Sequence, residues 1–262
     1  MRHCGLMNLL LLALLVSDDA IVPTKKIVLF NGQNLDGWYT WLRETGYKDP
    51  KEVFTVQDKQ IRVTGEDWGG LATKQAYKDY HLIVEWRWGG KTLPPREKAA
   101  RDSGILIHAV GEDGRYNRTW LESIESQIIE GGVGDIILVG GKDKPTLTVN
   151  TVQDGREVYW KQDGKPVTKD SGRFNWYGRS RVWKDTIDFH GVEDVEAPMG
   201  KWNRQEIFAF GDRITYVVNG KVVIHGYNSS HRSGKIQLQS EGAEIYFRRV
   251  ELQPIKKMPK VD

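Results

Sequence analysis

The sequence predicts an all-β fold built from antiparallel sheets, and three observations support this prediction. Short runs in which apolar and polar residues alternate recur along the chain, as expected for strands with one buried face. Turn dipeptides separate these runs, and no long stretch keeps the period of an amphipathic helix. Many short strands joined by regular turns are typical of a β-sandwich or barrel.

The strands can be placed in chain order from this alternation. They are expected at residues 80–88, 104–110, 207–210, 214–218, 221–225, 235–239 and 243–252. Asn219 and Gly220 separate two of these runs and give the strongest hairpin signal, because a type I′ turn needs a positive φ at both central residues. Asp154-Gly155 and Asp163-Gly164 indicate two further turns. The irregular region 140–200 is expected to form long loops on the same domain.

The N-terminus has the features of a targeting segment. A weakly basic start is followed by an apolar run from 6 to 16, which is shorter than the roughly 20 residues of a transmembrane helix. We therefore expect a secretory signal peptide at 1–20, a single domain at 26–255 and no membrane span after signal cleavage. An uncleaved anchor or a misassigned start codon is the alternative. Removal of 1–20 takes away Cys4, the only cysteine, which favours a bacterial periplasmic or secreted protein.

Composition excludes several functional classes. A net charge of +3, from 38 Lys+Arg and 35 Asp+Glu, gives no strong field for nucleic acid. One cysteine permits neither an internal disulfide nor a zinc cluster of the CxxC type. The chain has no Walker loop, GxGxxG or GxSxG motif, so nucleotide-dependent and acyl-transfer enzymes are not expected. The ten tryptophans either fill a core or stack on a flat ligand such as a sugar ring.

The segment 122–130 (ESIESQIIE) could carry acid–base chemistry. On a strand, Glu125 and Gln127 project to one face, and Glu130 joins them only if one residue between Gln127 and Glu130 is bulged. Paired carboxylates are what glycoside chemistry requires. The alternative, which composition alone favours, is a solvent-exposed strand face with ordinary polar residues.

This spacing resembles the E-x-D-x-x-E strand of the concanavalin-like, family-sixteen β-glucanases. The resemblance gives Glu125 the position of the nucleophile and Glu130 that of the acid/base. Gln127 stands where the family has an Asp. An amide cannot modulate proton transfer between two carboxylates, which argues against a standard retaining mechanism.

A second resemblance covers residues 27 to 254. The chain resembles the 3-keto-disaccharide hydrolase domain family in an ordered series of motifs, with Asp102 in place of the usual Asn. The matching segments are 29–38 (LFNGQNLDGW), 85–87 (EWR), 102–105 (DSGI), 125–129 (ESQII), 200–203 (GKWN) and 238–248 (LQSEGAEIYFR). Each motif is weak alone, but the ordered series is specific.

This resemblance implies a concanavalin-like jelly-roll sandwich of two antiparallel sheets with a concave face. It also implies cleavage of 3-keto-glycosides, with a saccharide as the partner. The C3 ketone acidifies the C2 proton, so that elimination expels the C1 oxygen and water then re-adds, for net hydrolysis. Such a route needs a base near C2, a donor or cation for the enolate oxygen and an acid for the leaving group.

Roles follow from the resemblance and from strand alternation. We expect Glu125 as base and Glu130 or His108 as acid, with His108 on the same strand face as Leu106. Arg87 could stabilise an enolate as a fixed cation, and the alternative is a salt bridge. Residues expected to bind sugar are Gln127, Gln239, Glu241, Trp120 and Trp183.

No metal is specified by the sequence. An acidic loop could hold Ca²⁺ through oxygen ligands, although it lacks EF-hand spacing and also fits a solvated charged loop. Its members are Asp185, Asp188, His190, Glu193, Asp194 and Glu196. Two other functions remain open, a non-catalytic carbohydrate-binding jelly-roll module and a family-sixteen-like β-glucanase.

Overall fold

The computed structural model describes residues 20–142 and 144–260, so the predicted signal peptide at 1–20 lies outside the described residues except for Ala20. Every regular element in these ranges is a β-strand. Within the same ranges, no helix with the length and apolar character of a membrane span is found.

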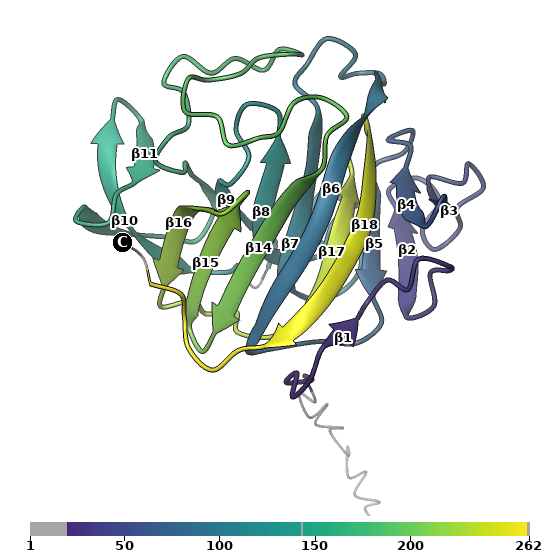
Figure 1. Ribbon diagram of the computed structural model, residues 1–262, viewed down its shortest axis with the longest axis horizontal. Helices are drawn as coiled ribbons and strands as arrows, with labels where there is room; N and C mark the ends of the chain where they lie inside the picture. The colour runs from purple at the N-terminus through teal and green to yellow at the C-terminus, as the bar shows by residue number, and fades with distance from the viewer. Residues whose placement is uncertain (1–19, 143, 261–262) are drawn as a thin grey trace, which may run out of the picture.

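The strands form two antiparallel sheets, as predicted for a jelly-roll sandwich (Figure 1). The large sheet has eleven strands: β1 (Ile27–Val28), β3 (Phe54–Gln57), β4 (Gln60–Val63), β6 (Tyr80–Thr92), β10 (Leu147–Asp154), β11 (Glu157–Trp160), β12 (Lys165–Lys169), β14 (Asn203–Phe210), β15 (Arg213–Val218), β16 (Lys221–Tyr227) and β18 (Ala243–Pro254). The small sheet has seven: β2 (Trp38–Leu42), β5 (Gly69–Thr73), β7 (Asp102–Val110), β8 (Glu122–Ile129), β9 (Ile136–Val139), β13 (Gly172–Phe174) and β17 (Lys235–Ser240).

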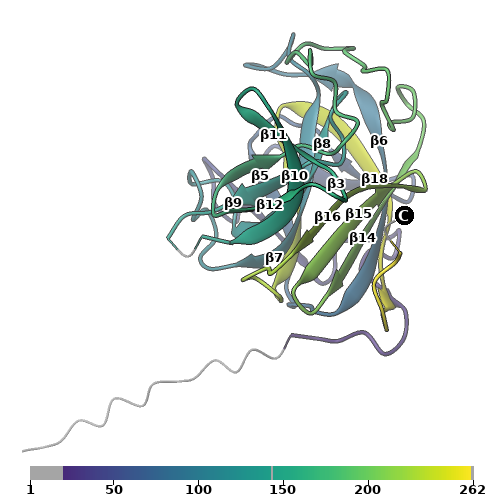
Figure 2. The same ribbon diagram turned by 90° about the vertical axis from the view of Figure 1, so that its left-hand side faces the viewer.

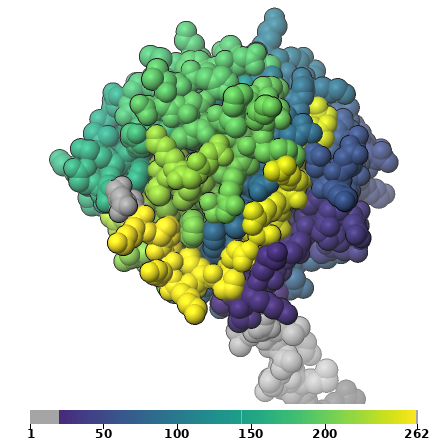
Figure 3. Space-filling view, viewed as in Figure 1, coloured from purple at the N-terminus to yellow at the C-terminus, as the bar shows by residue number. Residues whose placement is uncertain are grey.

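Strand order places non-sequential strands side by side. The small sheet runs β13-β9-β8-β7-β17-β5-β2, and the main path of the large sheet runs β11-β10-β16-β15-β14-β6-β18-β4-β3. The first strand, β1, pairs with β18, so the N-terminal segment (purple) lies beside the C-terminal strand (yellow) in Figure 3. The strands β7, β8 and β17, which carry the predicted site residues His108, Glu125, Gln127 and Gln239, are therefore neighbours in one sheet.

The core lies between the sheets and follows the predicted alternation. On β6, Trp86 and Trp88 point inward and are buried, whereas Arg87 points outward. Facing residues of the small sheet, such as Ile105 and Ile128, join the same core. The outer face of the small sheet is thereby left for polar side chains.

The region 140–200 differs in part from the expectation of long loops. Strands β10 to β13 occupy much of it, with turns at Asp154-Gly155 and near Asp163-Gly164 as predicted. The runs Leu147–Asp154 and Lys165–Lys169 contain the β-branched residues that favour strands. Figure 2 shows β10, β11 and β12 together at one side of the sandwich. Residues 175–202 do form a long loop.

Candidate active site

Strand register brings polar side chains together on the outer face of the small sheet. Glu125 on β8 lies opposite Leu106 on β7, which in turn lies opposite Gln237 on β17. Two residues further along β8, Gln127 lies opposite Gly104 on β7. Directly opposed residues share a face, so this face carries a carboxylate and two amides from neighbouring strands.

Glu125 and Gln239 converge above the backbone of β7 at Gly104. A Cβ atom at Gly104 would lie 2.3 Å from Glu125 Oε1 and 2.4 Å from Gln239 Oε1. A hydrogen bond between these two side chains lowers the pKa of the Glu125 carboxyl against the larger effect of its burial. Gly104 thus provides the room in which both side chains can lie on the strand.

Three carboxyl groups, Asp102, Glu125 and Glu241, form what we call the carboxylate cluster. Burial raises the pKa of Glu125 to about 8, and the charge of Asp102 adds to the effect. Burial also raises the pKa of Asp102, but only to about 6, because the Arg96 guanidinium opposes it from 3.3 Å. Burial raises the pKa of Glu241 well above its usual range, with both neighbouring carboxylates contributing. Near neutral pH, Asp102 is therefore mainly ionised and Glu125 mainly protonated.

Asp102 is a site residue that the sequence interpretation did not select. It was noted only as a substitute for Asn in the DSGI motif. Alternation along β7 does place Asp102 on the same face as Gly104 and Leu106. The alternation of side chains along β7 was therefore the signal that could have identified Asp102 as a site residue.

Several buried polar atoms on this face have no hydrogen-bond partner within the described part of the chain. They are Asp102 Oδ1, Gln237 Nε2 and Gln239 Oε1. An unsatisfied buried polar group costs about 1–3 kcal/mol. Two acceptors and one donor beside the carboxylate cluster suit a ligand with several hydroxyl groups.

An aromatic wall adjoins the cluster. Trp120 is nearly buried against Leu106, and its indole N–H donates to the Gly69 carbonyl at 3.2 Å. Its ring stacks on Trp68 with centroids 6.0 Å apart. Trp68 is half-buried and carries the Arg43 guanidinium 4.6 Å above its ring. The structure thus brings Trp120 to this face, and Trp68, which the sequence interpretation missed, is the more accessible of the two.

Glu130 does not join the cluster, because the bulge that would bring it there is absent. Pairing between β7 and β8 is regular from the pair of Leu106 with Glu125 to the pair of Asp102 with Ile129. Alternation then turns Glu130 away from Glu125, and its side chain, 2% exposed, is ion-paired with Arg101. The expectation of three polar groups in one groove is corrected here.

His108 also lies elsewhere than expected. It has a φ of +50° at an irregularity in β7, which breaks the alternation that would place it beside Leu106. Its ring meets the core residue Tyr80 edge-on at 5.7 Å, and its Nδ1–H donates to the His231 carbonyl at 2.9 Å. Burial lowers the pKa of His108 to about 4. The residue is a neutral part of the packed interior near neutral pH.

Arg87 belongs to the outer face of the large sheet. Its guanidinium lies 4.3 Å from the ring of Tyr246 and 5.2 Å from that of Trp202, and it donates to Gln60 at 3.1 Å. The sandwich separates it from Glu125, so the structure does not bring it to the carboxylate cluster.

Trp183 lies on the loop 175–202. Its indole N–H donates to the Glu130 carbonyl at 3.0 Å, and the Arg179 guanidinium lies 4.3 Å from its ring. It lines a pocket with Arg173, which is on the edge strand of the small sheet. Trp183 is therefore outside the cluster but beside a hollow at the same edge of the sheet.

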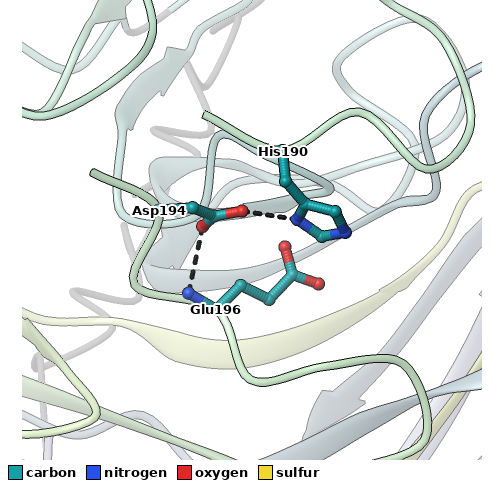
Figure 4. Close-up of side chains that lie close together, drawn as sticks. All are labelled: His190, Asp194 and Glu196. Carbon is teal, nitrogen blue, oxygen red and sulfur yellow. Dashed lines mark hydrogen bonds and ion pairs between the residues drawn. The ribbon is translucent and has the colours of Figure 1, made fainter. Parts of the chain in front are cut away.

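The acidic loop contains one compact group of possible metal ligands. Ligand atoms of His190, Asp194 and Glu196 lie within 4.8 Å of one another (Figure 4). Asp194 accepts hydrogen bonds from the His190 ring at 2.6 Å and from the Glu196 amide at 3.0 Å. The Glu196 carboxylate accepts from the Trp88 indole and the Gly131 amide. Each of these four carboxylate oxygens accepts a hydrogen bond from a protein donor, two from within the group and two from Trp88 and Gly131.

A family profile described as 3-keto-alpha-glucoside-1,2-lyase-like domain matches residues 25–253. No curated protein matches the chain.

Solved structures that resemble this chain are distant from it in sequence. Two of them are described as "putative glycosyl hydrolase" from Parabacteroides distasonis ATCC 8503. The first is 17% identical, its match covers 88% of this chain and 94% of its own, and its TM-score is 0.51. The second is 18% identical, its match covers 88% of this chain and 100% of its own, and its TM-score is 0.49. The carbohydrate binding module CBM66 from Bacillus subtilis is 14% identical over 82% of this chain and 94% of its own, with a TM-score of 0.44. The first of these supports the fold alone.

Proposed function

Because this chain belongs to the family of 3-keto-alpha-glucoside-1,2-lyase-like domains, we propose that it is an enzyme that cleaves 3-keto-glycosides. Family membership supports a carbohydrate-active function, and the proposal adds the oxidised substrate. The observation that carries it is the pair Asp102 and Glu125, two buried carboxyl groups on one face of the small sheet, within electrostatic reach of each other, whose pKa values are separated. Such a separation is how one site holds a base and an acid together.

In the proposed elimination, ionised Asp102 removes the proton from C2 of the 3-keto sugar. The C2–H electrons form the C1=C2 bond, and the bond from C1 to the glycosidic oxygen breaks. Protonated Glu125 donates its proton to the departing oxygen. The amide of Gln237, whose Nε2 has no partner among the described residues, is a donor for the enolate oxygen at C3.

Hydration completes net hydrolysis. Water adds its hydroxyl to C1 while Glu125, now ionised, accepts the proton that water loses. Asp102, now protonated, returns a proton to C2. The two carboxyl groups recover their starting states, and the product is a 3-keto sugar. These roles differ from the sequence prediction that Glu125 is the base. Because the family usually has Asn at the position of Asp102, the assignment of Asp102 as base is specific to this chain.

A retaining β-glucanase mechanism fits this geometry less well. Retention needs a nucleophile and an acid/base about 5–5.5 Å apart on one side of the substrate site. Glu130 is instead ion-paired with Arg101 and turned away from Glu125. The elimination route requires neither Glu130 nor the Asp that Gln127 replaces.

The test is to incubate the purified protein with a disaccharide and with its 3-keto form and to follow the products by mass. Cleavage of the keto form alone is the expected result. Cleavage of the unoxidised disaccharide would instead support a β-glucanase, and binding without turnover would support a carbohydrate-binding module.

Matched variants connect the activity to the cluster. Asp102→Asn and Glu125→Gln are each expected to lower kcat/KM about 10²–10⁴-fold, the usual contribution of a positioned acid or base. Glu196→Gln is the control, since burial also raises the pKa of Glu196 to about 8 but its partners lie outside the cluster. Wild-type turnover in the Asp102 and Glu125 variants would refute the assigned roles.

We also propose that the protein acts in the bacterial periplasm or outside the cell, as a domain spanning 26–255. The apolar run at 6–16 and the absence of cysteine after residue 20 support this proposal. Mass analysis of the exported protein is expected to show a new N-terminus near residue 20. A cytoplasmic protein that retains Met1 would contradict it.

A further inference from the structure

A pocket of about 490 Å³ opens beside the edge strand β13. Positive side chains dominate its lining: Arg156, Lys169, Arg173, Arg179 and Arg181. Two aromatic rings, Tyr159 and Trp183, also line it. We call this hollow the cationic pocket.

Nearby carboxylates do not neutralise these cations. Arg173 and Arg179 share the single carboxylate of Asp135, which is fully buried. One negative charge between two guanidinium groups leaves an excess of positive charge at the pocket wall.

Arg156, Lys169 and Arg181 also outnumber the carboxylates beside them. Arg181 pairs with Asp154 at 3.0 Å, and Glu157 also lines the pocket. Lys169 donates to a backbone carbonyl, that of Arg173, instead of to a carboxylate. Among the described residues, five positive side chains thus face three carboxylates that line the pocket or are ion-paired with its cations, Asp135, Asp154 and Glu157.

The guanidinium groups are held in place before any ligand arrives. Arg181 lies 3.2 Å from the centre of the Tyr159 ring, and Arg179 lies 4.3 Å from that of Trp183. Stacking on aromatic rings restricts a side chain that otherwise loses much entropy on binding. A fixed planar donor suits a planar or tetrahedral oxyanion, which it can bind through two parallel hydrogen bonds.

The cationic pocket continues from the carboxylate cluster along one row of the small sheet. Arg173 lies opposite Ile137, and Ile137 lies opposite Glu125. Neighbouring strands are about 4.8 Å apart, so the backbones of Arg173 and Glu125 are about 10 Å apart. The charge of Arg173 lowers the pKa values of both Glu125 and Asp102, which places it within their electrostatic reach.

We propose that the cationic pocket is a subsite for a negatively charged sugar unit, so that the preferred substrates carry a uronate carboxylate or a sulfate ester next to the 3-keto residue. This inference rests on the proposed function, because it adds the substrate class to the same site. The sugar bound at the cluster carries the ketone, and the oxyanion of its neighbour meets Arg156 and Arg181, which stand at the exposed part of the pocket.

The test measures binding calorimetrically with unoxidised probes, so that turnover does not interfere. The probes are cellobiose, the same disaccharide with one glucuronate, and the same disaccharide with one 6-sulfate. At low salt, at least one anionic probe is expected to bind about tenfold more tightly than cellobiose, and added salt is expected to reduce this advantage. The probe that binds better identifies the oxyanion.

Variants assign the preference to the pocket. Arg156→Gln and Arg181→Gln together are expected to remove most of the anionic advantage, which is the ratio of the affinity for the anionic probe to the affinity for cellobiose. Arg204→Gln is the matched control, because Arg204 and Arg181 are both 42% exposed and each pairs with one carboxylate, but Arg204 lies on the large sheet.

The outcomes separate this inference from the proposed function. Equal affinity for neutral and anionic probes, no binding of any probe, or an advantage that survives the double variant would each overturn the subsite. Turnover of a neutral 3-keto-disaccharide reports on the proposed function alone, because neither substituted arginine belongs to the carboxylate cluster. Turnover without anionic preference would thus refute only the subsite.

Discussion

Asp102 and Glu125 differ in charge state because their nearest charges differ. Both are buried, which favours the neutral acid, but Asp102 has Arg96 beside it and Glu125 has Asp102 beside it. The cation keeps Asp102 ionised near neutral pH, and the resulting anion keeps Glu125 protonated. Asp102 as proton acceptor and Glu125 as proton donor therefore lie on either side of Gly104. Asp102 is two residues before it on β7, and Glu125 lies opposite Leu106, two residues after it.

This pairing predicts a bell-shaped pH profile for kcat/KM on a 3-keto-disaccharide. Activity is expected to rise as Asp102 loses its proton near pH 6 and to fall as Glu125 loses its proton near pH 8. Steady-state rates between pH 4 and 10 test this. A profile that rises through pH 8 to a plateau would instead identify ionised Glu125 as the base.

His108 is expected to make stability depend on pH in a different range. Its pKa of about 4 in the folded protein lies below the value of 6.5 for a free side chain, so the unfolded chain binds more protons between these values. Its full contribution is present above pH 6.5 and is lost as pH falls towards 4, by up to about 3 kcal/mol.

Urea unfolding of the wild type and of His108→Asn at pH 4.5 and 7 checks this. Asn tolerates the positive φ of this position and does not titrate. The variant is expected to lose less stability between the two pH values than the wild type does. An equal loss in both proteins would show that another group is responsible.

At the scale of elements, the placement of the Glu125 and Gln239 side chains over β7 depends on Gly104. Gly104→Ala would place a methyl group within 2.4 Å of the oxygens of both Glu125 and Gln239. Because these side chains must move, turnover is expected to fall at least tenfold, with a loss of stability of about 1–3 kcal/mol.

Gly90→Ala on β6 is the control, since nothing lies within 4 Å of the added Cβ. Steady-state kinetics measures the loss of turnover in both variants, and thermal unfolding measures the loss of stability. If Gly104→Ala retains wild-type turnover, the position of Glu125 over this glycine is not required.

Strand alternation predicted the elements well because the side-chain period is a local property. Applied to β6, alternation puts Trp86 and Trp88 on one face and Arg87 on the other, as observed. Asn219-Gly220 joins β15 and β16 as expected. Alternation also put Glu125 and Gln127 on one face.

The rest of the site depended on properties that a single strand does not contain. His108 left its expected face at an irregularity where β7 meets its neighbours, and Glu130 stayed off that face because no such irregularity follows Gln127. Arg87 could not be excluded without knowing to which sheet β6 belongs. Arg173 reaches the site only through the order of strands.

At the scale of the molecule, packing and strand pairing hold the described chain together without a disulfide, since the only cysteine lies at position 4. One apolar cluster extends between the two sheets, while the outer face of the small sheet carries buried polar groups. In the small sheet, the inner face thus contributes to the apolar core, and the outer face carries the proposed site.

This division predicts that the site lowers the stability of the whole protein. Glu125 ionises at about 8 in the folded protein and at 4.5 in a free side chain, so its ionisation favours the unfolded chain. Its contribution is fully present below pH 4.5 and is lost as pH rises towards 8. Glu125→Gln, which has no charge to desolvate, is therefore expected to be more stable than the wild type at pH 8, by on the order of 2 kcal/mol, and not at pH 4. Denaturant unfolding at the two pH values measures the difference, and an inactive variant without this gain would show that the buried carboxyl is not the source of the cost.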